Sequence, residues 1–141
     1  MPSFGANSKN ILKTCHPDLV LVMEQSIKVM DFSVLEGHRS MQRQNQLFKQ
    51  RSTKVLFPNS KHNAMPSNAV DVAPYPIDWS NEHKNLSRYY YLAGTIMAIA
   101  HKLKAQGRIT NHLRWGGDWD MDKNFADQNF DDLVHFEILE D

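Results

Sequence analysis

Apolar positions in the N-terminal third of the chain follow first a helical period and then a strand period. From residue 17 to 30, apolar residues recur at steps of three and four, and Pro17 suits a first helical turn. This pattern predicts a helix that faces the core. The next segment, 31–37, alternates apolar and polar residues and ends at Gly37, which predicts a short strand and a turn.

A second helix is predicted from Ser40, a good capping residue, to about Arg51. One face of this helix is expected to point inward, with Gln44 as its polar exception: Met41, Gln44, Leu47 and Phe48. The polar stretch 52–68 contains prolines and asparagines and is predicted to be a loop, long enough to be functional.

The segment 69–74 has Asp71 and small residues on one face and two valines on the other, so a strand is expected to present Asp71. Ser80 and Asn81 are candidate caps for a long helix to about Ala105, which Gly107 can end. Its expected inner face is Leu86, Tyr90, Ala93, Met97, Ala100 and Leu103.

The C-terminal part is predicted to contain an acidic loop, 118–132, and a last strand, 133–139, on which His135 and Glu137 share a face. Helices and strands are interspersed with long loops. This order favours an α+β fold with a small antiparallel sheet flanked by helices, in a single domain over residues 1–141.

Composition narrows the function classes. Hydrophobic residues make up 41% of the 141 residues and charged residues 23%, as in ordinary globular proteins. Lys plus Arg equals Asp plus Glu, at 16 each, which argues against nucleic-acid binding. No apolar run is long enough to cross a bilayer and the N-terminus lacks a secretory pattern, so cytoplasmic synthesis without membrane association is expected. A monomer is the default.

The single cysteine, Cys15, cannot form an internal disulfide. Its neighbour His16 permits a cysteine and histidine nucleophile, but nothing else in the sequence supports one. A buried, inert thiol is therefore favoured.

Two of the seven histidines are candidates for metal binding. His62 lies on the loop that leads to Asp71, and His135 lies on the last strand, so two imidazoles and a carboxylate can converge if the strands are neighbours. Histidines hydrogen-bonded to a carboxylate are the structural alternative. The other five are expected to be bystanders, with a place in the lining of a site as the alternative for His38. They lie before a helix, at the turn 37–39, in the long helix and its first turn, and in a turn before Leu113: His16, His38, His83, His101 and His112.

Four segments together resemble a family of peptidoglycan peptidases. Residues 60–62 (Ser-Lys-His) with 69–71 (Ala-Val-Asp), and 132–135 (Asp-Leu-Val-His), match its Ser-x-His…Ala-x-Asp and Asp-x-x-His motifs. Residues 37–40 with Gln44, and 115–119 (Trp-Gly-Gly-Asp-Trp), match two more. The family includes D-alanyl-D-alanine carboxypeptidases of the vancomycin-resistance type and L-alanyl-D-glutamate endolysins of bacteriophages, and it shares the Hedgehog-like zinc fold. The spacer 63–68 is longer than is common there.

The resemblance implies a zinc hydrolase. Its zinc ligands would be His62, Asp71 and His135. Asp132 would be the general base for a water activated by zinc, with the adjacent Asp131 as the alternative. Glu137 would orient an imidazole.

The resemblance also implies a set of residues that contact substrate. Arg39 would pair with a carboxylate of the stem peptide, the alternative being a surface salt bridge. Gln44 and Ser60 would hydrogen-bond the substrate or the ligands, and Trp115 would wall the site.

The acidic loop suggests a second ion. Asp118, Asp120 and Asp122 space oxygen ligands at alternate positions, as calcium loops do, although glycine is missing at the sixth place. The alternative is a solvated acidic loop.

Within the family, the resemblance favours an endopeptidase that cuts the L-alanyl-D-glutamate bond of the stem peptide. The alternatives are a D-alanyl-D-alanine carboxypeptidase and a non-catalytic, zinc-stabilised wall-binding module. An endolysin would wait in the host cytoplasm and reach the periplasm or cell wall after a holin opens the membrane.

Overall fold

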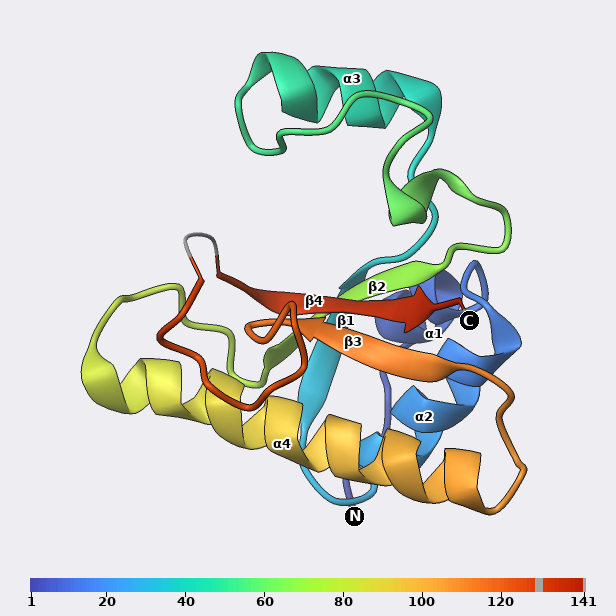
Figure 1. Cartoon of the computed structure of the whole chain (residues 1–141), viewed down its shortest axis with the longest axis vertical. Coiled ribbons are helices and arrows are strands. Elements are labelled where there is room, and N and C mark those ends of the chain that lie inside the picture. The colour runs from blue at the N-terminus through green and yellow to red at the C-terminus, as the bar shows by residue number, and fades with distance from the viewer. Residues whose placement is uncertain (129–130, 141) are drawn as a thin grey trace.

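A four-stranded antiparallel sheet with strand order β1-β2-β4-β3 forms the centre of the protein. The computed structural model describes residues 1–128 and 131–140. Its elements are α1 (Ala6–Leu12), α2 (Pro17–Ile27), β1 (Phe32–Glu36), α3 (Met41–Lys49), the 3-10 turn η1 (Lys61–Asn63), β2 (Ala69–Pro74), α4 (His83–Ala105), β3 (His112–Gly116) and β4 (Asp132–Leu139). The predicted α+β class, with a small antiparallel sheet, is confirmed (Figure 1).

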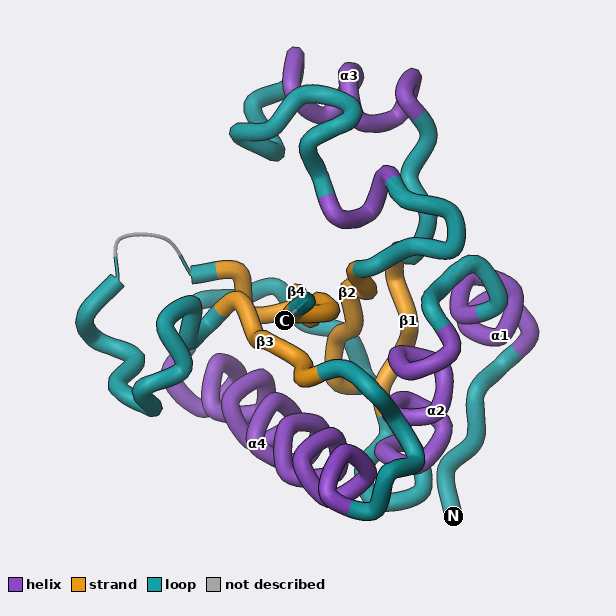
Figure 2. Tube along the Cα trace, turned by 45° about the vertical axis from the view of Figure 1, so that its right-hand side comes forward, coloured by secondary structure: helices purple, strands orange, loops and turns teal. Residues whose placement is uncertain are grey.

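The two faces of the sheet have different surroundings. Helices α2 and α4 cover one face, whereas α3 stands apart beyond the other (Figures 1 and 2). Val70 and Val72 of β2 point with Phe136 of β4 into the covered face, and all three are at most 1% exposed. Since side chains alternate along a strand, Asp71 and His135 point to the opposite face. One strand pattern therefore builds both the core and the site.

Helix α2 begins at Pro17 as predicted, and it ends at Ile27 rather than residue 30. The ring Nδ1 of His16 caps it by accepting a hydrogen bond of 3.0 Å from the Asp18 amide. The carboxylate of Asp18 accepts hydrogen bonds from the backbone amides of Thr110 and Asn111, which lie just before β3. This carboxylate therefore ties the start of α2 to the sheet.

Helix α4 begins later than predicted, at His83, because Glu82 is its cap and accepts hydrogen bonds from the Lys84 and Asn85 amides. Ser80 and Asn81 are not caps. Gly107 follows the helix with the positive φ of +70° that suits its predicted role. The inner face is only partly as expected, because α4 packs on both the sheet and α2: it consists of Asn85, Tyr89, Leu92, Ala93, Ile96, Ala100 and Leu103.

Helix α3 forms where predicted, with the Ser40 hydroxyl accepting a hydrogen bond from the Arg43 amide. Its predicted apolar inner face is wrong. Gln44 is the buried residue of α3, whereas Met41 and Phe48 are 53% and 38% exposed. The reason is that α3 projects from the body of the protein (Figure 2), and none of its residues belongs to the apolar core.

Three elements have no counterpart in the sequence-based assignment: α1, β3 and the 3-10 turn η1, which lies in the predicted loop 52–68. Helix α1 is too short for periodicity to reveal, and a hydrogen bond of 3.0 Å from the Val34 amide to the Ser8 hydroxyl fixes it on β1. Strand β3 begins at His112, which was predicted to lie in a turn. Residues 129 and 130 of the predicted loop 118–132 lie outside the described residues, and β4 already begins at Asp132.

The spacer 63–68 after His62 is held by the N-terminal part of the chain. The Ser67 carbonyl accepts a hydrogen bond of 2.8 Å from the His16 amide, and the Ser67 amide donates one of 2.8 Å to the Thr14 carbonyl. The longer spacer thus packs beside α1 and α2. Among the described residues, no helix has the length and apolar character that a bilayer crossing requires.

Candidate functional site

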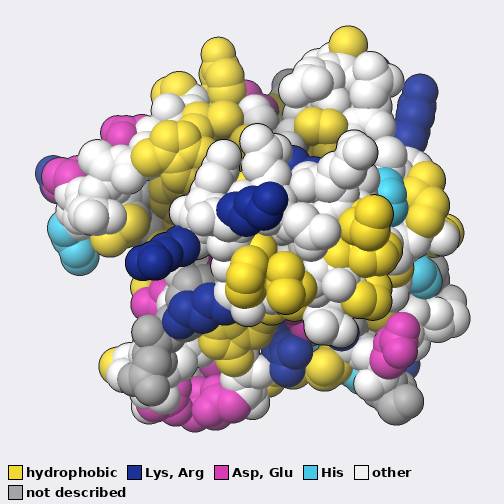
Figure 3. Space-filling model, turned by 90° about the horizontal axis from the view of Figure 1, so that it is seen from above, with side chains coloured by type: hydrophobic (Ala, Val, Ile, Leu, Met, Phe, Trp, Pro, Cys, Tyr) yellow, Lys and Arg dark blue, Asp and Glu magenta, His cyan; other side chains and the backbone are white. Residues whose placement is uncertain are grey.

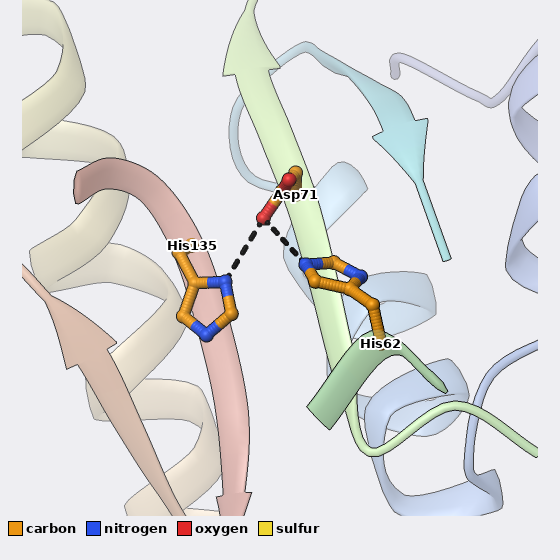
Figure 4. Close-up of side chains that lie close together, drawn as sticks. All are labelled: His62, Asp71 and His135. Atoms are coloured by element: carbon orange, nitrogen blue, oxygen red, sulfur yellow. Dashed lines mark hydrogen bonds and ion pairs between the residues drawn. The ribbon is translucent and has the colours of Figure 1, made fainter. Parts of the chain in front are cut away.

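Three side chains from separate segments meet on the open face of the sheet: His62 of η1, Asp71 of β2 and His135 of β4 (Figure 4). Asp71 Oδ1 lies 3.2 Å from His62 Nε2 and 3.1 Å from His135 Nδ1. Asp71 and His135 are direct partners in the β2–β4 register, so their side chains are adjacent on the same face. The structure brings together the trio that the sequence predicted.

A local hydrogen-bond network sets the position of His62. The Ser60 hydroxyl accepts a hydrogen bond of 3.2 Å from the His62 amide, and the Asn63 side chain accepts one from the Ser60 amide. This reciprocal pair is a capping box. Of the two predicted roles of Ser60, a hydrogen bond to a ligand residue is the one that the structure contains, because the Ser60 hydroxyl holds η1 and with it His62.

The outward nitrogens of both imidazoles are hydrogen-bonded. His62 Nδ1 lies 2.8 Å from the Gly37 carbonyl oxygen, and His135 Nε2 lies 2.8 Å from Glu137 Oε1. A carbonyl only accepts, so His62 Nδ1 carries a proton, and Nε2 is the nitrogen that faces Asp71. Nitrogen and carboxylate donors that face a common point suit a metal cation, and the partners of their outer nitrogens are typical of metal-binding histidines.

The buried charges influence one another strongly. Burial alone would raise the pKa of Asp71, but hydrogen bonds and charge from His135 and His62 hold it well below its usual range. Burial would lower the pKa of His135, yet Asp71 and Glu137 raise it to about 9. The site therefore favours an ionised carboxylate that faces positive charge.

Glu137 connects His135 to two cations. Its Oε2 lies 2.7 Å from Arg114 Nη2 and 3.4 Å from Lys61 Nζ. Burial opposes ionisation, but His135 and Arg114 outweigh it and lower the pKa of Glu137 to about 2. Glu137 is 5% exposed and lies where it can orient the imidazole, in the position that the sequence predicted.

Arg39 is 8% exposed, and its donors point to protein groups. Its Nε and Nη2 donate to the two carboxylate oxygens of Glu36 at 3.0 and 2.7 Å, and its Nη1 donates to Gln44 Oε1 at 2.9 Å. Nη2 also lies 3.8 Å from Asp71 Oδ2. Neither a substrate anchor nor a surface salt bridge describes this residue, which instead supports Asp71 from a buried position.

Gln44 is fully buried, and its amide is engaged inside the protein. Its oxygen accepts from Arg39 and, at 3.4 Å, from Asn63 Nδ2, while its nitrogen donates to the Val55 carbonyl. The prediction that Gln44 contacts substrate is therefore corrected. It links α3 and the following loop to η1.

Trp115 lies on the wrong face of the sheet to wall the site. It is the register partner of Phe136, is 4% exposed, and packs edge-on against Tyr90 of α4 at 5.4 Å between ring centroids. Trp119 is the tryptophan beside the trio, with its ring centroid 5.7 Å from that of His135. The motif 115–119 thus contributes its second tryptophan to this side.

The two aspartates before His135 have different surroundings. Asp132 has a raised pKa, first because it is buried and then because of the charge of Asp71, and it also responds to both histidines of the trio. Asp131 accepts a hydrogen bond of 2.6 Å from Gln128 Nε2. Asp132 is therefore the one coupled to the site.

The acidic loop brings Asp118, Asp120 and Asp122 together, each with a carboxylate oxygen within 4.8 Å of the others. Lys123 occupies the sixth place with a φ of +66°, the conformation that glycine provides in calcium loops. Its amide donates to Asp118 Oδ2, whereas the buried Asp118 Oδ1 has no hydrogen-bond partner among the residues that the structure describes. The backbone therefore makes the left-handed turn of a calcium loop although its sixth residue is lysine instead of glycine.

Sequence reasoning missed several residues that build the site: Glu36, Lys61, Asn63, Arg114 and Trp119. The Ser-x-x-Asn spacing of residues 60–63 was a readable capping signal. The pairing of Arg114 with Glu137 was not readable, because it depends on the register of β3, a strand that was not predicted.

This fold and this site define a class, an α+β hydrolase with a candidate single-metal centre on the open face of its sheet. The family model described as phage L-alanyl-D-glutamate peptidase matches residues 2–139. The chain belongs to this family. The predicted peptidase activity on the L-alanyl-D-glutamate bond is thereby confirmed, in preference to a carboxypeptidase or a non-catalytic module.

Solved structures agree with this assignment. The chain is similar to the crystal structure of the L-Ala D-Glu endopeptidase ChiX from Serratia marcescens, with a TM-score of 0.71 and 28% sequence identity. The match covers 96% of this chain and 89% of that one. A comparison with curated proteins finds no match.

Proposed function

We propose that the chain is a zinc-dependent endopeptidase whose metal ligands are His62, Asp71 and His135. The observation that carries this proposal is the convergence of two ring nitrogens on Asp71 Oδ1, at 3.2 and 3.1 Å, while the outer ring nitrogens are hydrogen-bonded elsewhere. Three His and carboxylate ligands are the usual protein contribution to a catalytic zinc site. Zinc bound there supplies Lewis acidity toward the scissile carbonyl and a water molecule.

Asp132 is the proposed general base. Its raised pKa favours a carboxylate that accepts a proton and returns it to the leaving amine near neutral pH. Asp131, hydrogen-bonded to Gln128, is the less suitable candidate. Arg39 Nη2 lies 3.8 Å from Asp71 Oδ2, the carboxylate oxygen that faces away from both histidines, and supports the negative charge of this ligand.

The side of the molecule that α3 occupies suits an acidic substrate. Residues 37–70 contain six Lys and Arg and neither Asp nor Glu. Seen from this side, Lys and Arg side chains lie across the middle of the surface and acidic groups gather near its edges (Figure 3). Because Arg39 pairs with Glu36 inside the protein, we assign the stem-peptide carboxylates to the exposed cations of this segment, such as Lys49 and Arg51.

The test is digestion of purified peptidoglycan, with and without a chelator, followed by mass spectrometry of the new termini. The proposal predicts new D-glutamate amino termini that a chelator abolishes and zinc restores. His135→Ala should lose both metal and activity, whereas Asp132→Ala should keep metal and lose activity. Full activity in Asp132→Ala would remove the proposed base, and activity that resists chelation would remove the zinc.

Calcium is the proposed second ion, held by Asp118, Asp120 and Asp122. The support is the left-handed backbone at Lys123 and the unpartnered Oδ1 of Asp118. Calcium should raise the midpoint of thermal unfolding in the wild-type chain and not in Asp118→Asn. An equal rise in both proteins would indicate binding elsewhere.

The cellular setting follows from the family as a proposal. The chain would accumulate as a monomer in the host cytoplasm and act on the wall after a holin opens the membrane. Expression in bacteria with and without a pore-forming holin tests this, because lysis should require both proteins.

A further inference from the structure

His135 is part of a closed circuit of contacts with Glu137, Arg114 and Trp119, called here the His135 contact circuit. His135 Nε2 meets Glu137 Oε1 at 2.8 Å, and Glu137 Oε2 meets Arg114 Nη2 at 2.7 Å. The Arg114 guanidinium carbon lies 5.5 Å from the centre of the Trp119 ring, and that ring lies 5.7 Å from the imidazole of His135. The circuit therefore surrounds the imidazole on two sides.

Within the His135 contact circuit, Arg114 contacts both of the residues that flank His135, namely Glu137 and Trp119. It is the register partner of Glu137, so β3 and β4 place the two side chains opposite each other. Its Nη2 binds the carboxylate, and its Nη1 lies 3.4 Å from the Trp119 carbonyl oxygen. A planar guanidinium can bind a carboxylate at one edge and lie over an aromatic ring, whereas an ammonium group is a single point charge.

Lys61 provides an internal comparison. It also approaches Glu137 Oε2, but at 3.4 Å, with a side chain 36% exposed, and its remaining contact is with the Ile138 carbonyl. Removing Lys61 would leave the Arg114 contact intact. Removing Arg114 would leave Glu137 with the longer, more solvated ion pair and would take the cation from the face of Trp119.

We infer that Arg114 is a positioning residue for the metal site: by fixing Glu137 and Trp119, it holds the imidazole of His135 with Nδ1 toward Asp71. This inference rests on the proposed zinc site. Groups that orient a metal-binding histidine typically change metal affinity by about 10- to 100-fold when they are mutated. Arg114 acts one contact further away, so a loss of about tenfold is expected.

The experiment measures zinc affinity directly, by competition with a chromophoric chelator, in the full chain stripped of metal. Arg114→Met should bind zinc about tenfold more weakly, and its cobalt-substituted form should show altered visible absorption bands, because the ligand geometry changes. Arg114→Lys, which keeps the charge but not the planar fork, should recover only part of the affinity. The exposed Arg108→Met is the matched control and should bind zinc within about twofold of wild type.

The outcomes separate two failures. If the wild-type chain does not bind zinc, the proposed function fails before the role of Arg114 is tested. If the wild type binds zinc and Arg114→Lys matches it in affinity and in the cobalt spectrum, the positioning role is overturned. Should Arg114→Met fail to fold by circular dichroism, Arg114→Lys still decides the question, since it retains a cation beside Glu137.

Discussion

Glu137→Gln tests the buried electrostatics of the site with the smallest change of shape. Two donors face the two carboxylate oxygens of Glu137: His135 Nε2 at 2.8 Å and Arg114 Nη2 at 2.7 Å. A glutamine has one oxygen and one NH₂, so one of these donors must then face another donor. The Glu137 side chain is only 7% exposed, so water cannot readily replace the lost acceptor.

The expected loss follows from that mismatch. A buried donor left without a partner costs about 1–3 kcal/mol, and hydrogen bonds to charged groups lie toward the upper end. We therefore expect the free energy of unfolding of Glu137→Gln to fall by about 1–3 kcal/mol relative to wild type. Glu140→Gln, the same chemical change at an exposed position after β4, should stay within about 0.5 kcal/mol.

The loss should also depend on pH, and the sign follows from the two pKa shifts. The pKa of Glu137 falls from 4.5 to about 2, so its contribution is complete above pH 4.5 and disappears as the pH drops toward 2. The pKa of His135 rises from 6.5 to about 9, so its contribution is complete below pH 6.5 and disappears as the pH rises through 9. The difference between the two proteins should therefore be largest between pH 4.5 and 6.5.

The assay is urea unfolding followed by circular dichroism across this pH range, with a chelator present throughout so that metal binding does not contribute. Parallel changes in midpoint at constant slope would report stability alone. If Glu137→Gln were as stable as wild type at pH 5.5, the ion-pair assignment of Glu137 with His135 and Arg114 would be refuted.

Three further predictions use other parts of the molecule. Gly37→Ala should lower the free energy of unfolding in urea by about 1–3 kcal/mol and weaken zinc binding. The new Cβ would lie 2.5 Å from Thr14 Oγ1 and displace the Gly37 carbonyl that holds His62. Its control, Gly94→Ala on α4, meets open space and should raise the free energy of unfolding by up to about 1 kcal/mol. Asp18→Asn should be less stable than wild type above pH 3.8, and the difference in stability should disappear as the pH falls further. The reason is that hydrogen bonds from Asn111 and Thr110 outweigh burial and lower the pKa of Asp18. Equal stability of the two proteins at pH 7 would contradict this. Chelation of bound zinc should lower the thermal midpoint of wild type and leave that of His62→Ala unchanged, as calorimetry can check.

The sequence was most informative where periodicity and motif coincide. The alternation in 69–74 correctly separated Asp71 from the valines of the core, and the last strand correctly set His135 apart from Phe136. These predictions depend only on the two-residue period of a strand. The neighbouring positions of the two strands came from the resemblance, because pairing order is not readable from one strand pattern.

The predictions failed where a residue's role depends on what the tertiary structure puts beside it. Arg39 and Gln44 are polar residues near a site, and their sequence positions do not reveal that Glu36 and the Val55 carbonyl already engage them. Which of the two tryptophans of residues 115–119 lies beside the site could not be predicted, because it depends on the side of the sheet that each one occupies: Trp115 packs in the core and Trp119 beside His135. The predicted apolar face of α3 was wrong because this helix projects from the body, and none of its residues belongs to the apolar core.

The spacing of the metal trio along the chain has a consequence for when the enzyme becomes competent. His135 follows Asp71 by 64 positions, with α4 and β3 in between, whereas His62 and Asp71 are only nine positions apart. During synthesis, a ribosome therefore produces two ligands long before the third, and a two-ligand site holds zinc weakly. The proposed zinc site is therefore complete only once β4 pairs with β2, and a chain that ends before residue 135 lacks one of its three ligands.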